Sequence, residues 1–355
     1  MSHRDQATEI RQGEELDPGR VEAFLRANIE GLQGPLTIKQ FPSGYSNLTY
    51  FITVGTREMV LRRPPHGTKA KSAHDMHREY RVLSALHPHF PYCPRPLAFC
   101  EDQAVMGCHF YVMERIKGII IRRRVPPELG LGLQQMRRLT ERLIEVMAEL
   151  HAVDYAAAGL AGLGKPAGYV RRQVEGWSLR YRNARTPDVP DGEAVMAWLL
   201  AKMPPESASP ALIHNDFKLD NVVLDEAAPL RIIGVLDWEM ATLGDPLMDL
   251  ACTLAYWVQA DDPPEMQSVA SSITNQPGCL TRAQVVELYG QRTGRVMDQI
   301  DFYYTFGLFR LTVIVQQIYY RYHHGQTKDQ RFAQLGATTH ALLAQAGRVI
   351  AQSAL

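Results

Sequence analysis

Two stretches of the sequence decide the fold: Leu212-Ile213-His214-Asn215-Asp216-Phe217-Lys218-Leu219-Asp220-Asn221 and Ile232-Ile233-Gly234-Val235-Leu236-Asp237-Trp238-Glu239. The first is His-x-Asp-x-x-x-x-Asn between two apolar runs, and the second places an aspartate directly after an apolar strand pattern. An aspartate on a loop can accept a hydroxyl proton, while an asparagine and a second aspartate offer hard oxygen ligands to Mg²⁺. Phosphoryl transfer needs this apparatus, because there the protein mainly positions reactants and neutralises charge. A plain polar turn is the alternative, but it requires neither the histidine nor the second aspartate.

The chain on either side of these stretches changes character near residue 115. Before it, short extended patterns alternate with turn signals, which predicts an antiparallel sheet over Leu36–Phe41, Leu48–Val54, Glu58–Arg63, Leu97–Glu101 and Cys108–Glu114. Helices are predicted after the Asp17-Pro18 pair and over residues 73–86. Beyond it, helical periodicity predominates, over Gln134–Val153, Tyr169–Ala184, Gly192–Met203, Pro246–Gln259, Arg282–Thr293, Met297–His324 and Asp329–Gln352. The expected fold class is therefore α+β, with a small β-rich N-lobe and a larger helical C-lobe.

The composition is that of an ordinary soluble enzyme. Among 355 residues, 46% are hydrophobic and 21% charged, and 38 basic residues balance 38 acidic ones. Zero net charge argues against a general nucleic-acid or membrane-surface binder. Five cysteines without Cys-x-x-Cys spacing indicate free thiols in a reducing compartment, and a polar N-terminus is unlike a signal peptide. We expect a cytoplasmic protein that uses neither nucleic acid nor membrane as a partner. Its oligomeric state is not predicted.

The motif HNDFKLDN followed by LDWE resembles the aminoglycoside phosphotransferase/choline kinase superfamily, which has the protein-kinase-like fold. The sequence is most similar to bacterial phosphotransferases that resemble the kinase-like domains of the acyl-CoA dehydrogenase 10/11 group. By position, the resemblance implies that Asp216 is the catalytic base and that Lys218 touches the transferring phosphate. It also implies that Asn221 and Asp237 bind Mg²⁺, with Glu239 assisting a second ion. His214 is expected to brace the loop rather than to carry a proton.

The resemblance assigns nucleotide binding to an N-lobe of residues 1–114, in which 1–16 are expected to form a flexible tail. Between two predicted strands, Phe41–Leu48 would cover the phosphates of ATP, although it contains a single glycine; the contributing residues would be Ser43, Gly44, Ser46 and Asn47. Proteins of the family have an ion pair between the third strand and the following helix. The resemblance implies that Arg62 and Glu79 form this pair here, with arginine in place of lysine. Arg63 is the alternative, but it points to the other face of its strand. Adenine would contact the linker through Met113, Glu114 and Ile116.

The C-lobe, residues 115–355, would bind a small-molecule hydroxyl acceptor. Residues 171–185 contain five arginines and one acid, and we expect substrate contacts from Arg171, Arg172, Trp177 and Arg180. This surface would repel cationic aminoglycosides or choline and attract an anion. The association of the similar proteins with acyl-CoA metabolism suggests a hydroxy acid or a hydroxyacyl-CoA. The same arginines could equally be a solvated helix face.

The sequence therefore predicts an ATP- and Mg²⁺-dependent small-molecule phosphotransferase. Three alternatives stay open: a kinase-like module that binds nucleotide or acyl-CoA without chemistry, a metal-dependent phosphoester hydrolase, and a kinase of the aminoglycoside or choline type. Asp216, Asn221 and Asp237 together argue against a module without chemistry, whereas the arginine at position 62 keeps it open. The hydrolase hypothesis explains neither the turn at Gly44 nor the Arg62/Glu79 pair.

Overall fold

The computed structural model of the chain describes residues 6–42, 47–65 and 75–355, and these form two compact units. The first unit contains the residues up to Ile120 together with Ala158–Leu160 and Asn221–Glu239. The second contains Ile121–Ala157, Ala161–Asp220 and Met240–Leu355. The first unit thus ends at Ile120 rather than at the expected Glu114, and it also includes a segment from the expected C-lobe.

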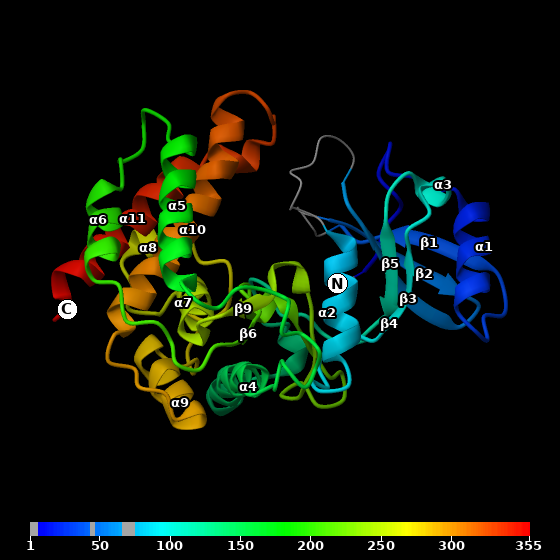
Figure 1. Cartoon of the computed structure of the whole chain (residues 1–355), viewed down its shortest axis with the longest axis horizontal. Helices are drawn as coiled ribbons and strands as arrows, with labels where there is room; N and C mark the ends of the chain where they lie inside the picture. Colours follow the sequence, from blue (N-terminus) through cyan, green and yellow to red (C-terminus); the bar gives the residue numbers. More distant parts are fainter. Residues whose placement is uncertain (1–5, 43–46, 66–74) are drawn as a thin grey trace. The chain divides into compact units, whose positions relative to one another are not determined.

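The first unit is built on a five-stranded antiparallel sheet in the order β1-β2-β3-β5-β4 (Figure 1). The strands are β1 (Leu36–Gln40), β2 (Leu48–Val54), β3 (Arg57–Arg63), β4 (Pro96–Cys100) and β5 (Phe110–Glu114). Alternate residues of β2 are fully buried, as expected for a strand with one face on a core. That core also takes the apolar face of helix α1 (Pro18–Asn28), which Asp17 caps by accepting from the Arg20 amide.

Two helices complete this part of the first unit. Helix α2 (Met76–Leu86) connects β3 to β4 and packs on β4 and β5, and the short α3 (Gln103–Met106) follows β4. The side chain of Asp75 caps α2 by accepting from the Arg78 amide, which fixes where the helix begins. The α2 prediction was therefore correct from residue 76 onward.

Residues 6–16 belong to the segment expected to be a flexible tail, and in the structure they contact the sheet and the core of the first unit. Thr8 pairs with Gln40 at the edge of the sheet through two backbone hydrogen bonds of 2.8 and 2.9 Å. Leu16 is buried in the core, and the hydroxyl of Tyr50 donates to the carbonyl of Glu14 at 2.7 Å. The polar composition of the segment concealed these contacts, because its backbone rather than its side chains provides most of them.

A late segment of the chain completes the first unit. Strands β7 (Val222–Leu224) and β8 (Ile232–Val235) form a two-stranded antiparallel sheet. The amide of Val235 donates to the carbonyl of Tyr92 at 2.7 Å, and Ile119 forms a bridge with Leu224. The indole of Trp238 packs edge-on against Phe90 at 5.9 Å. Residues 221–239 are therefore part of the core of the first unit, although they lie a hundred positions beyond its sheet.

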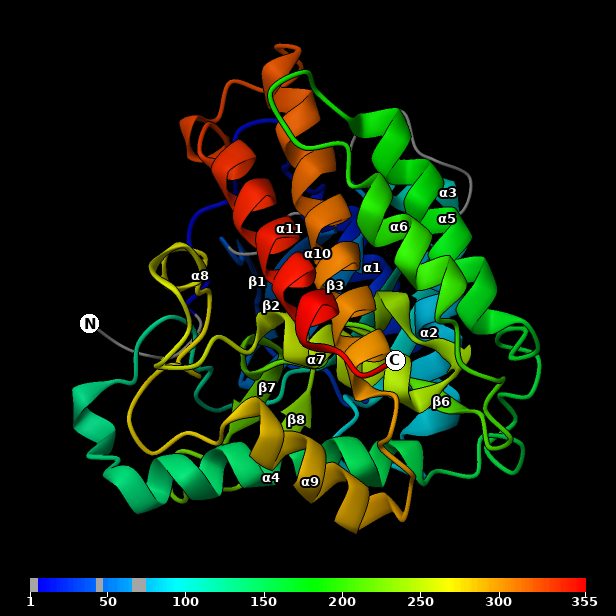
Figure 2. The ribbon, with the colours of Figure 1, turned by 90° about the vertical axis from the view of Figure 1, so that its left-hand side faces the viewer.

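The second unit is mainly helical (Figures 1 and 2). Its helices are α4 (Leu133–His151), α5 (Tyr169–Ala184), α6 (Glu193–Ala201), α7 (Pro246–Tyr256), α8 (Pro264–Ser268), α9 (Arg282–Thr293), α10 (Ile300–His323) and α11 (Leu335–Gln352). Helix α10 packs against α5, α7 and α11, and α4 packs against α9. Strands β6 (Ala211–Ile213) and β9 (Thr242–Gly244) form a small antiparallel sheet beside them. No helix within 6–42, 47–65 and 75–355 is long and apolar enough to span a bilayer.

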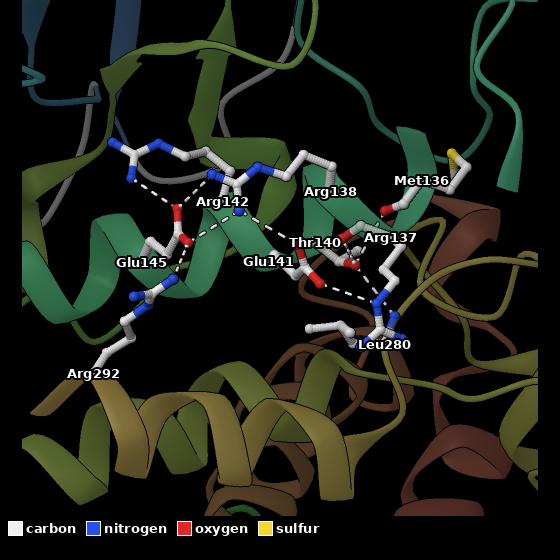
Figure 3. Close-up of polar contacts among 9 residues, drawn as sticks. All are labelled: Met136, Arg137, Arg138, Thr140, Glu141, Arg142, Glu145, Leu280 and Arg292. Atoms are coloured by element: carbon white, nitrogen blue, oxygen red, sulfur yellow. Dashed lines mark hydrogen bonds and ion pairs between the residues drawn. The ribbon is translucent and has the colours of Figure 1, made fainter. Parts of the chain in front are cut away.

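An ion-pair cluster joins α4 to α9. Glu145, whose side chain is 10% exposed, accepts from Arg138, Arg142 and Arg292 at 2.7–3.2 Å (Figure 3). On the same helix the hydroxyl of Thr140 donates to its own helix backbone and accepts from the Leu280 amide at 3.2 Å. These arginines lower the pKa of Glu145 in spite of its burial, so the carboxylate stays charged and holds the two helices together.

Candidate active site

A loop of the second unit carries Asp216, and a buried aspartate on α7 fixes its backbone. Asp249 accepts from the amides of His214 and Asn215 at 2.7 and 2.6 Å, and from Nε2 of His151 at 3.0 Å. His151 in turn contacts the hydroxyl of Tyr289 at 2.7 Å. Although burial opposes its charge, these donors lower the pKa of Asp249. The loop therefore leaves β6 in a single, strongly fixed conformation.

His214 contacts the backbone of this loop, and its role as a brace stays a prediction. It is fully buried, and its Nδ1 accepts a hydrogen bond from the Asp216 amide at 3.2 Å. The next residue, Asn215, has a φ of 67°, and its side chain donates to the carbonyl of Met240 at 3.0 Å. Asparagine tolerates this left-handed region better than most residues do. The resulting turn directs Asp216 away from the buried strand.

Asp216 and Lys218 are brought together. The ammonium group of Lys218 donates to both carboxylate oxygens of Asp216, at 2.9 and 2.8 Å, and lies over the ring of Tyr256 at 4.6 Å. Burial lowers the pKa of Lys218, but Tyr256 and Asp216 outweigh burial and raise it above its ordinary value. Lys218 is therefore protonated at neutral pH. The side chain of Asp216 is 19% exposed, so solvent reaches it.

Asn221 and Asp237 lie at the same end of the small sheet in the first unit. Asn221 directly precedes β7 and Asp237 is the second residue after β8, and the amide of Leu236 donates to the carbonyl of Asn221 at 2.8 Å. Asp237 has a φ of 68° and a side chain that is 36% exposed. Among the residues that the structure describes, no three acidic, histidine or cysteine side chains gather into a complete metal site. Mg²⁺ needs fewer than three such protein ligands, because one or two carboxylates suffice when phosphates and water supply the other ligands.

Arg62 connects the expected charge pair to the expected metal ligands. Its Nη1 donates to Oε1 of Glu79 at 2.6 Å, and its Nη2 donates to Oδ1 of Asp237 at 3.1 Å. Oε2 of Glu239 lies 3.5 Å from the same Nη2. Burial lowers the pKa of Arg62, but Glu79, Tyr111 and Asp237 together raise it well above its ordinary value. A planar guanidinium can hold several carboxylates at once, which a lysine ammonium does with less geometric precision.

The predicted phosphate-covering loop is only partly described, because Ser43, Gly44 and Ser46 lie outside the described residues. Asn47 is buried and donates to Oε2 of Glu239 at 2.7 Å, so it joins the Arg62 network. The expected adenine linker begins where β5 ends. There Met113 is buried, the amide of Glu114 donates to the carbonyl of Arg95 at 2.8 Å, and Ile116 lies against Gly234. Adenine binding by these three residues stays a prediction.

The four expected acceptor-binding residues fall into two pairs on α5. Arg171 is exposed and pairs with Glu175, while Arg172 bonds to the carbonyls of Lys165 and Ala167. Trp177 is buried, and the guanidinium of Arg180 lies over its ring at 4.7 Å. Arg171 and Arg172 thus have local partners, whereas Trp177 and Arg180 lie together.

Sequence reasoning missed two residues that hold the loop carrying Asp216 and Lys218. Asp249 and Arg310 both bond to the loop backbone, Arg310 through Nη2 and the carbonyl of Asn215 at 3.0 Å. Arg310 lies within the pattern of an aromatic helix, and Asp249 lies in the first turn of another helix. Neither position indicates a contact with the loop that carries Asp216. A charged residue at a position with apolar neighbours on both sides is the one signal that the sequence offers for them.

Comparisons with known proteins show the family to which the chain belongs. The family model described as "Phosphotransferase enzyme family" matches residues 37–278. The chain is 33% identical over 326 residues to acyl-CoA dehydrogenase family member 11 of Gallus gallus, covering 89% of this chain and 41% of that protein. It therefore spans about two fifths of that relative. It is also 30% identical to a solved protein of Ralstonia eutropha, provisionally described as an aminoglycoside phosphotransferase, with a TM-score of 0.82 over 96% of this chain and all of that one.

More distant structures share the fold alone. Choline kinase of Cryptosporidium parvum is 13% identical with a TM-score of 0.63, covering 95% of this chain and 97% of that one. Aminoglycoside phosphotransferase APH(4)-Ia, solved with ADP and hygromycin B, is 18% identical with a TM-score of 0.57 over 94% and 99% of the two chains. Both confirm the kinase-like α+β fold expected from the motifs. The match of the family model over most of the chain shows that this protein belongs to the phosphotransferase enzyme family of aminoglycoside phosphotransferases.

Proposed function

We propose that this chain is an ATP- and Mg²⁺-dependent kinase that transfers the γ-phosphoryl group of ATP to a hydroxyl group of a small anionic acceptor. One observation carries the proposal: the carboxylate of Asp216 lies on a loop fixed by Asp249 and is held by both of its oxygens by the protonated Lys218. A loop that is fixed this strongly positions a general base without reorganisation. Family membership and the ADP-bound relative support ATP as the donor.

In this proposal each residue has one task. Asp216 accepts the proton of the acceptor hydroxyl, whose oxygen attacks the γ-phosphorus while the bond from that phosphorus to the β,γ-bridging oxygen breaks and ADP leaves. Lys218 donates to the phosphoryl oxygens and compensates the charge that develops there. Arg62, oriented by Glu79, contacts the phosphates of the nucleotide.

Mg²⁺ fits the donor set at the end of β7 and β8. Asp237 offers a partly exposed carboxylate and Asn221 an amide oxygen, which are hard ligands suited to this ion. A bound ion would neutralise phosphate charge. Nη2 of Arg62 already contacts Oδ1 of Asp237, so this carboxylate would hold both the guanidinium and a bound ion.

The proposed acceptor is a hydroxy acid or a hydroxyacyl-CoA. The curated relatives belong to the acyl-CoA dehydrogenase family, which supports an acceptor of acyl type. A kinase of the aminoglycoside or choline type is the second candidate, and the solved relatives favour it. Incubation with Mg²⁺, ATP and a pool of hydroxy acids, hydroxyacyl-CoAs, sugars, choline and kanamycin decides between them, because the acceptor gains the mass of one phosphoryl group.

The variant Asp216→Asn tests the base. We expect turnover to fall about 10²–10⁴-fold while the Kd for ATP is unchanged, because an amide cannot accept the proton but leaves the nucleotide side intact. Turnover is measured as ADP released together with phosphorylated acceptor.

Asp298→Asn is the matched control, since Asp298 is exposed and has no role in the site. Full turnover of Asp216→Asn would contradict the proposal. Phosphate release without any acceptor would instead favour a hydrolase, and ATP binding without turnover in the wild type would favour a module without chemistry.

A further inference from the structure

A small cavity in the second unit lies beside the loop that carries Lys218. Its lining includes Lys218 and Asp220 from this loop, Tyr256 from α7, and Ser272 and Thr274 from the segment between α8 and α9. The volume open to the centre of a water molecule is about 10 Å³. That is close to the smallest volume that holds one water molecule, so the cavity has room for one small occupant.

Three buried oxygen atoms around this cavity have no hydrogen-bond partner among the described residues. They are Oδ1 of Asp220, Oγ of Ser272 and Oγ1 of Thr274. Ser272 and Thr274 are only 9% and 6% exposed, so bulk solvent does not replace the missing partners. In the described part of the chain eight side-chain atoms are buried in this way, and three of them belong to this one cavity. Buried polar atoms of folded proteins almost always bond to the protein or to ordered water, so this concentration indicates an occupant.

The chemistry of these oxygens fits a water molecule. A hydroxyl group both donates and accepts hydrogen bonds, and a carboxylate oxygen accepts them. A water molecule can therefore donate to Asp220 and form one bond with each of Ser272 and Thr274, which is the usual number of partners for a buried water. A metal ion fits less well, because Lys218 and Arg122 already act on the charge of Asp220. These two cations would repel another one.

We infer that Asp220, Ser272 and Thr274 bind one ordered water molecule, which links the end of the Lys218 loop to the segment between α8 and α9. Asp220 lies two residues after Lys218 and directly before Asn221. Fixing Asp220 therefore limits movement of the backbone that positions these two neighbours. The three water-binding side chains are positioning residues. Binding of the water does not depend on the proposed kinase function, whereas its effect on turnover does.

The substitution Thr274→Val tests the site, with Thr305→Val as its matched control. Each replaces a hydroxyl group by a methyl group of similar size. The hydroxyl of Thr305 on α10 is also buried without a partner, but Thr305 does not line the cavity. Thr274→Val should lower the midpoint of thermal unfolding by about 2–4 °C, the shift for one lost hydrogen bond in a unit of this size. Thr305→Val should not lower it, because its hydroxyl has no bond to lose.

Ser272→Ala is the second variant, and it should lower the midpoint as Thr274→Val does. Crystal structures of the wild type with and without a thallium(I) soak identify the occupant. We expect a water peak about 2.6–3.2 Å from the three oxygens, without anomalous signal from thallium. An empty cavity or a thallium peak would overturn the inference. So would midpoints of Thr274→Val and Ser272→Ala that are no lower than that of Thr305→Val.

Turnover tests the link to Lys218. With the acceptor that the mixed pool identifies, Thr274→Val should lower kcat about 3–10-fold relative to Thr305→Val and leave the Kd for ATP unchanged, because the water positions the loop rather than the nucleotide. Equal kcat values in the two variants would overturn this link. A water peak and lowered midpoints without phosphoryl transfer by the wild type would instead overturn the proposed function and leave the water site standing.

Discussion

At the scale of single residues, buried charged side chains fix the backbone that carries the partly exposed charged residues of the candidate site. Asp249 has no solvent exposure, yet it fixes the two residues before Asp216 and pairs with His151. Its role could not be predicted, because it lies 35 positions from His214 and only the fold brings the two together. By contrast, Asp216, Lys218, Asn221 and Asp237 could be singled out, because their spacing along the chain is itself the motif.

Asp249→Asn tests this dependence. An amide keeps one acceptor oxygen but introduces donors where three groups already donate, so we expect the free energy of unfolding at pH 7 to fall by about 3–5 kcal/mol, the usual cost of breaking a buried pair. Denaturant unfolding of both proteins measures the difference.

The pH dependence gives a second check. Because the fold lowers the pKa of Asp249 below its ordinary value of 3.8, its contribution is fully present above pH 3.8 and is lost as the pH falls further through the folded-state pKa. The difference between wild type and Asp249→Asn should therefore shrink below that pH. If the difference in unfolding free energy stays constant down to strongly acidic pH, the charge of the Asp249 carboxylate does not stabilise the fold.

At the scale of elements, caps and periodicity predict where most helices and strands lie, with bounds that differ by a few residues in many of them. The bounds of β2, α5 and α9 were predicted without error, because proline, glycine or capping residues mark their ends. Strand β9 and helix α8 were not predicted. Three residues such as Thr242–Gly244 are too few to show a period, and they become a strand only through pairing with β6.

The contact of α10 with α7 depends on a glycine that no pattern indicated. A Cβ at Gly307 would lie 2.1 Å from the carbonyl oxygen of Ala251, so the helices can approach only because that atom is missing. We expect Gly307→Ala to destabilise the protein by at least 1–3 kcal/mol, because backbone must move in a packed core. Thermal unfolding measures the change.

Gly347→Ala on α11 is the matched control. No atom lies within 4 Å of the Cβ it would add, and alanine favours a helix interior by roughly 0.5–1 kcal/mol over glycine. The two substitutions are chemically identical, and only the surroundings of the two glycines differ. We therefore expect Gly307→Ala to lower the free energy of unfolding and Gly347→Ala to raise it. An equally harmless Gly307→Ala would mean that the helices do not pack this closely.

At the scale of the whole molecule, the α+β class and the kinase-like fold could be predicted, but the division of the chain could not. Residues 221–239 directly follow the loop that carries Asp216 and Lys218, and no change of composition or pattern separates them from it. The structure assigns them to the first unit because Val235, Trp238 and Leu224 bond to and pack on residues 90–119.

A fragment of residues 1–120 should therefore fail to fold by itself. Without residues 221–239, Phe90 loses the indole of Trp238, and the carbonyl of Tyr92 and both backbone groups of Ile119 lose their partners. Amide chemical-shift dispersion and near-ultraviolet circular dichroism report the loss of fixed packing. Joining residues 221–239 to this fragment through a glycine-serine linker should restore much of it. Cooperative unfolding of the bare fragment would disprove this account of the first unit.

The late arrival of residues 221–239 has a consequence for synthesis on the ribosome. At about 5–20 residues per second, the nascent N-terminal sheet waits roughly 5–20 s after residue 120 for the segment that completes it. During that interval the ring of Phe90 lacks the indole of Trp238, and the backbone groups of Ile119 lack their partners on Leu224. Translation speed between these positions, and chaperones that shield apolar surfaces, therefore become determinants of how much active protein a cell obtains.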